Sequence, residues 1–90
     1  LDDPDAAVRA AAVEGLGSLG HWPSAPSLSD RLGDPAWPVR RAAGLALRRL
    51  GGTGRLYLRR ALQADDQFAV DMARQVLDLP ERVARDAVRH

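Results

Sequence analysis

The residues best suited to chemistry in this 90-residue sequence are arginines gathered in its middle. No Asp or Glu occurs between Pro35 and Ala64, and the sequence contains 13 arginines and no lysine. The cluster consists of Arg40, Arg41, Arg48, Arg49, Arg55, Arg59 and Arg60. A guanidinium presents several N–H donors in a planar fork that suits carboxylates and phosphates. The cluster therefore indicates either an anion-binding surface or an ordinary solvated surface that balances acidic ends.

The overall charge of the chain bears on whether the arginine cluster would bind an acidic protein or nucleic acid. The formal net charge is only +1, and acidic residues flank the arginine cluster on both sides. Binding to a nucleic-acid duplex depends mainly on cations that neutralise phosphates, so this balance favours an acidic protein partner over nucleic acid. Arg55 and Arg59 lie one helical turn apart, with Tyr57 between them in the sequence.

Few other residues suggest a reaction. His21 and His90 are the only histidines, there is no cysteine, and no Ser–His arrangement indicates a nucleophile. The acidic pairs at 2–3 and 65–66 are explained first as helix starts. We therefore predict a non-catalytic chain with no cofactor and no metal.

Two tryptophans leave alternatives open. Trp22 and Trp37 stand in the predicted turns before and after a short helix. They either pack over a junction between structural units or form an exposed anchor for a partner.

The composition predicts a core of small side chains. Ala, Leu and Val dominate, and there is no Ile. At roughly 25 cal/mol per Å² of buried apolar surface, such a core is marginal, so we expect it to depend on neighbouring repeats or a partner. No run approaches the ~18 consecutive apolar residues of a membrane span, and we predict a cytoplasmic location.

A repeat of 31 residues must position these side chains. Leu1–Gly20 returns as Leu32–Gly51, with ten of twenty positions identical at a constant offset. A drifted third copy follows Asp65, in which Asp71 replaces the arginine of the first two copies. The period predicts a solenoid whose repeats span about 1–31, 32–63 and 64–90.

Apolar residues three and four positions apart predict six helices. Their expected ranges are 4–18, 24–32, 35–50, 54–64, 66–79 and 80–89. Asp3 and Asp34, each followed by proline, are expected to cap helices, and Thr53 is a candidate cap of the fourth. Gly20 is a candidate left-handed helix stop.

The pattern L-x-D-P-(x)₃-V-R-x-A-A-(x)₃-L-(x)₂-L-G resembles the bacterial HEAT repeat, of the short type first associated with phycobilisome lyases. Both near-complete copies carry every fixed position, and the third keeps Asp65, Val70 and Ala73. The resemblance implies an all-α fold, an α-α superhelix (HEAT-repeat solenoid) of about three antiparallel helix pairs. First helices would lie on the convex side, and second helices would line the concave side.

The resemblance also implies a ladder of ion pairs between repeats. In the family, the aspartate before proline pairs with the arginine after valine. Carried over to this sequence, the ladder residues are Asp3, Arg9, Asp34 and Arg40, with Asp65 as a further candidate.

The first functional hypothesis is a non-catalytic scaffold for protein–protein interaction, the C-terminal part of a longer solenoid. Its expected partner surface is on the concave side: Arg55, Tyr57, Arg59, Arg60 and Arg31, with Ser24 and Ser27 beside them. The alternatives are nucleic-acid or phosphate binding through the arginine cluster, and an accessory domain of a lyase-type enzyme.

Overall fold

The computed structural model describes residues 3–20 and 22–80, and the regular secondary structure of this part of the chain is helical throughout, without strands. The elements in order are α1 (Ala6–Leu19), η1 (Trp22–Ser24), α2 (Ala25–Asp30), η2 (Arg31–Gly33), α3 (Trp37–Arg49), α4 (Gly52–Ala61) and α5 (Gln67–Asp78), where η marks a 3₁₀ helix. The predicted all-α class is confirmed. The sixth predicted helix, 80–89, lies outside the described residues.

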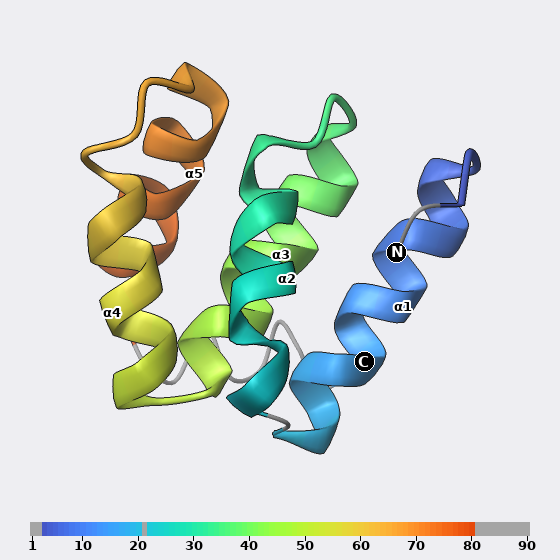
Figure 1. The fold of residues 1–90 in the computed structure, drawn as a ribbon, viewed down its shortest axis with the longest axis horizontal. Coiled ribbons are helices and arrows are strands. Elements are labelled where there is room, and N and C mark those ends of the chain that lie inside the picture. Colours follow the sequence, from blue (N-terminus) through green and yellow to red (C-terminus); the bar gives the residue numbers. More distant parts are fainter. Residues whose placement is uncertain (1–2, 21, 81–90) are drawn as a thin grey trace.

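The helices form two layers that step along the molecule (Figure 1). The first layer contains α1, α3 and α5, in which α3 packs against both of its neighbours. The second layer contains α2 and α4, which pack against each other and against α3, while α4 also contacts α5. In Figure 1, α2 lies in front of α3 and α4 in front of α5. This regular step is the solenoid-like arrangement that the repeat predicts.

Small residues let the first-layer helices approach closely. A Cβ atom built on Gly17 of α1 would lie 2.6 Å from the Cβ atom of Ala46 in α3. One built on Gly44 of α3 would lie 2.6 Å from Cγ2 of Val76 in α5. Between the layers, Leu and Val side chains fill the core, and those with no exposed surface include Val13, Leu28, Leu32, Val39, Leu47 and Leu58.

The Asp-Pro pairs form turns ahead of the helices and do not cap them. The carboxylate of Asp3 accepts the N–H of Asp5 at 2.8 Å, and that of Asp34 accepts the N–H of Ala36 at 2.9 Å. Asp5 is the residue that caps α1, since its side chain accepts the N–H of Ala7 at 2.8 Å. The prediction of Asp3 and Asp34 as caps was wrong because an aspartate readily bonds the N–H two residues later and closes its own turn.

Two glycines mark helix boundaries. Gly20 ends α1 in the left-handed conformation, with φ of 64°, and its N–H donates to the carbonyl of Gly17 at 3.1 Å. The predicted stop is therefore confirmed. The prediction of Thr53 as a cap was wrong, because α4 already begins at Gly52, directly after Gly51 with φ of 76°.

The second helix is shorter than the predicted 24–32. Pro23 and Pro26 fall near its start, where proline supplies no N–H for helical hydrogen bonding. Only Ala25–Asp30 is α-helical, and a 3₁₀ turn adjoins each end. α2 packs chiefly on α3 and α4, so its main neighbours belong to the following repeat.

Candidate functional site

A buried ion pair joins the first repeat to the second. Arg9 of α1 donates from Nε to Oδ2 of Asp34 at 2.9 Å and from Nη2 to Oδ1 at 3.0 Å. The Asp34 side chain is fully buried, and its Oδ1 also accepts the N–H of Ala36. The hydrogen bonds from Arg9 lower the pKa of Asp34, although burial works in the opposite direction. Asp34 therefore stays ionised and holds two repeats in register.

Arg40, the equivalent arginine of the second repeat, makes different contacts. Its Nη1 donates to the carbonyl oxygens of Asp34 at 2.7 Å and Pro35 at 3.0 Å. Its guanidinium lies over the ring of Phe68, 4.2 Å from the ring centroid. Among the described residues Arg40 forms no ion pair with Asp65, the further candidate for the ladder.

The third repeat differs because an acid stands where the second carries proline. Asp66 takes the place of Pro35 at an offset of 31, and its carboxylate accepts the N–H of Phe68 at 2.9 Å. This cap starts α5 at Gln67, one residue earlier than the period predicts from the start of α3. In this repeat Asp65 is exposed, and the ring of Phe68 lies under Arg40.

An exposed strip of α4 carries two of the five predicted partner-binding residues, Arg59 and Arg60. Leu56 is 46% exposed, and Arg59 and Arg60 are exposed on the same strip. No carboxylate of the described residues lies within ion-pair distance of these two arginines. We call Leu56, Arg59 and Arg60 the α4 patch.

Arg55 and Tyr57 flank the α4 patch on opposite sides, since residues two apart in a helix point about 200° apart. Both are half-buried. Tyr57 packs against the core, and the guanidinium of Arg60 lies 5.6 Å from the centroid of its ring. The structure thus joins Tyr57 to Arg60, whereas the sequence places it with Arg55 and Arg59.

Arg31 and Arg48 occupy other places in the fold. Nη1 of Arg31 lies 3.6 Å from Oδ2 of Asp34, which places Arg31 at the junction between repeats. Arg48 of α3 donates from Nη1 to the carbonyl oxygens of Val76 and Leu77, near the C-terminal end of α5. A cation at this end of a helix bonds free carbonyl groups and opposes the negative end of the helix dipole.

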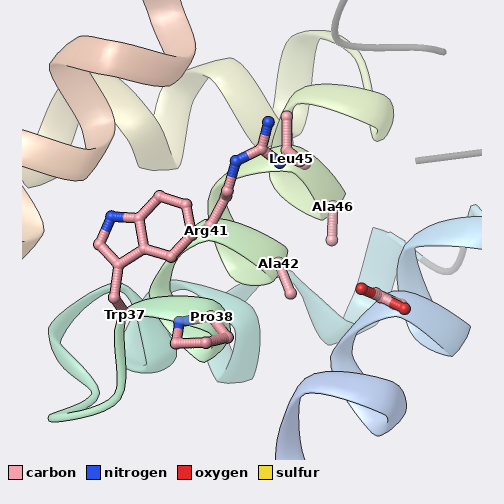
Figure 2. Close-up of a pocket in the computed structure, with 7 residues that line it drawn as sticks. Trp37, Pro38, Arg41, Ala42, Leu45 and Ala46 are labelled. Atoms are coloured by element: carbon pink, nitrogen blue, oxygen red, sulfur yellow. The ribbon is translucent and has the colours of Figure 1, made fainter. Parts of the chain in front are cut away.

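A cleft of about 170 Å³ opens between α1 and α3 on the first layer. It is lined by Glu14 of α1 and by Trp37, Pro38, Arg41, Ala42, Leu45 and Ala46 of α3 (Figure 2). Trp37 is 51% exposed, and the guanidinium of Arg41 lies 5.8 Å from the centroid of its ring. Trp37 therefore lies at the junction between two repeats and is also partly exposed to solvent. The other tryptophan side chain, Trp22, lies outside the described part of the structure.

The comparison with protein families agrees with this geometry. The family model described as HEAT repeats matches residues 1–78. The chain belongs to the HEAT repeat family. No curated protein and no solved structure matches it.

Two features are absent from the described part of this HEAT-repeat chain. It contains no group of three or more His, Cys, Asp or Glu side chains arranged to hold a metal ion. None of its helices has the length and apolar character needed to cross a membrane. The described HEAT repeats have two surfaces on which arginine and apolar side chains lie together: the α4 patch and the cleft beside Trp37.

Proposed function

We propose that this chain is a non-catalytic HEAT-repeat scaffold that binds an acidic protein segment at the α4 patch. HEAT repeats are commonly protein-interaction scaffolds. The finer resemblance to the bacterial phycobilisome-lyase type rests on the repeated L-x-D-P and V-R residues and belongs to the same proposal.

The observation that carries the proposal is an exposed apolar side chain one helical turn before two exposed arginines. Leu56 is 46% exposed, while Arg59 and Arg60 lack a carboxylate partner among the described residues. Arginine is enriched at the energetic centres of protein interfaces, where its fork binds carboxylates and its stem packs on apolar groups. The α4 patch therefore suits a segment that presents an apolar residue next to Asp or Glu.

The rigidity of α4 supports the same function. Leu58 of α4 is fully buried, and a Cβ atom on Gly54 would overlap the carbonyl of Leu47, so α4 sits tightly on α3. A side chain on such an element loses less conformational freedom on binding than one on a loop. Contacts with a partner thus face a preformed surface.

A selection from a displayed peptide library tests the proposal and does not require the partner to be identified first. We expect the enriched peptides to carry Asp or Glu beside an apolar residue, and to bind less tightly as salt is added. The double variant Arg59→Glu/Arg60→Glu should abolish the binding of these peptides to the α4 patch. Arg74→Glu, which reverses an exposed charge on α5, is the matched control and should leave binding unchanged.

Nucleic acid is the competing outcome of the same experiment. If the selected peptides have no acidic bias, and a labelled DNA or RNA oligonucleotide binds with an affinity that depends on Arg59 and Arg60, the protein-scaffold proposal is wrong. The affinity for the oligonucleotide would then fall steeply as salt is added, because each phosphate that an arginine neutralises releases a bound counterion.

A further inference from the structure

The cleft beside Trp37 has a different lining from the next junction along the solenoid. At an offset of 31, its residues correspond to positions that line the junction of α3 with α5. The pairs that decide the charge and the depth of the cleft are Glu14 with Leu45, Arg41 with Met72, and Ala46 with Leu77. Met72 is 2% exposed and Leu45 5%, while Leu77 packs against the core. At these three positions the second junction is apolar, whereas the first has an opening with charged walls.

The size of the cleft limits what it can hold. Its volume is about 170 Å³. Sites for small molecules and cofactors generally begin at roughly 300 Å³. The cleft is therefore suited to a single side chain of a partner.

The lining specifies the chemistry of that side chain and its neighbour. Ala42 and Ala46 are buried apolar residues, and the exposed ring of Trp37 adds an apolar wall (Figure 2). Arg41 contacts this ring, and no carboxylate of the described residues lies within ion-pair distance of its guanidinium. Its N–H donors are available to an incoming carboxylate.

We propose that the cleft is a second docking site, in which Arg41 and Trp37 bind a protein segment with an apolar side chain followed by Asp or Glu. The apolar side chain packs on Ala42, Ala46 and Trp37, and the following carboxylate accepts hydrogen bonds from Arg41. Glu14 disfavours a second acid on the opposite wall by like-charge repulsion. The cleft lies on the first-helix layer, so this site is separate from the α4 patch of the proposed function.

The test uses capped peptides and nuclear magnetic resonance of the full chain. Acetylated and amidated Ala-Ala-Leu-Glu-Ala-Ala is titrated against the labelled protein. We expect the largest changes in chemical shift at the indole N–H of Trp37 and at the backbone amides of Arg41 and Ala46. Replacing Leu with Ala, or Glu with Gln, in the peptide should weaken binding by about tenfold.

Two variants separate the roles of charge and shape. Arg41→Met introduces the residue found at the matching position of the next junction, keeps a long aliphatic stem without the charge, and should remove the preference for Glu over Gln. Ala46→Leu should fill the cleft and abolish binding of the Leu-Glu peptide and of its Gln version. If Ala46→Leu disturbs the fold through its contact with Gly17, Arg41→Met alone decides the question.

Specific outcomes would overturn this proposal independently of the α4 patch. One is the absence of shifts at Trp37 with the Leu-Glu peptide, and another is an unchanged Glu preference in Arg41→Met. Arg59→Glu/Arg60→Glu should leave peptide binding at the cleft unaffected. Loss of cleft binding in that double variant would assign the peptide to the α4 patch and refute a second site.

Discussion

Asp34 is the buried acid of the described residues, and its charge depends on Arg9. Because Arg9 bonds the ionised form, the pKa of Asp34 in the folded state lies below its value in the unfolded chain. Such a group stabilises the fold above its unfolded pKa, near 4. This contribution is lost as the pH falls through the folded pKa. The ion pair between Arg9 and Asp34, which joins two repeats, therefore stabilises the fold less as the pH becomes acidic.

Asp34→Asn tests this pH dependence. Asn keeps an acceptor for the N–H of Ala36 but removes the charge that Arg9 contacts. We expect the free energy of unfolding at pH 7 to fall by about 2 kcal/mol, and the difference from the wild type to shrink as the pH falls below about 4. Urea denaturation at several pH values measures both. The exposed Asp65→Asn is the control, and equal losses at pH 7 and pH 3 would contradict the linkage.

Two helical glycines should respond in opposite ways to alanine. A Cβ atom on Gly15 meets no other atom within 4 Å, so Gly15→Ala should stabilise the fold by about 0.5–1 kcal/mol. A Cβ atom on Gly44 would lie 2.6 Å from Cγ2 of Val76 and force α3 from α5, so Gly44→Ala should cost roughly 1–3 kcal/mol. Denaturant midpoints of the two variants compare them directly. A gain from both would mean that α3 and α5 pack less tightly than the structure shows.

At the scale of elements, the sequence predicted the existence of the helices more accurately than their starts. The 31-residue period and the apolar spacing locate α1 to α5 correctly. The starts were misplaced because Asp3 and Asp34 bond their own turns, while Asp5 and Asp66 supply the caps. An acid near a helix start can take either role, and the choice depends on local backbone geometry that the pattern does not specify.

The contact of Arg48 with α5 is an element-scale feature that the repeat could not predict. The matching positions in the other copies are Gly17 and Leu79, which cannot make this contact. Arg48→Met should keep the packing of the stem but leave the carbonyls of Val76 and Leu77 without their cation.

We expect Arg48→Met to reduce stability by roughly 1.5 kcal/mol and to speed hydrogen exchange chiefly in the last turn of α5. The neighbouring exposed Arg49→Met is the matched control and should change neither quantity. Uniform acceleration of exchange over all helices would argue against a local capping role.

At the scale of the whole molecule, the fold divides the arginine cluster that looked continuous in the sequence. Arg40 lies over Phe68, Arg41 contacts Trp37, and Arg48 bonds the end of α5. Only Arg59 and Arg60 remain on the exposed patch with Leu56. Nearness along the chain says little about which neighbours each side chain meets, because those neighbours come from adjacent repeats. The candidate site could therefore be predicted as a region of the chain but not residue by residue.

The outer face of α1 shows what a neighbouring repeat contributes to the whole stack. Val8 is 49% exposed, whereas its counterpart Val39 on α3 is fully buried. Ala11 is exposed, whereas its counterpart Ala42 is buried. Asp3 forms the same turn as Asp34, and its carboxylate accepts no arginine among the described residues. The exposed face of α1 thus matches the face of α3 that α1 covers.

Fusing a second copy of residues 1–31 ahead of Leu1 should therefore raise the stability of the array. The added helix would bury Val8 and Ala11, and its arginine equivalent to Arg9 would reach Asp3. We expect one cooperative transition with a Tm higher by roughly 5 °C or more, because repeat stability is a sum of unit and interface contributions. Asp3→Asn should remove part of the gain in the fused chain and have little effect in the original one. Two separate transitions in calorimetry would show that the added copy does not stack on α1.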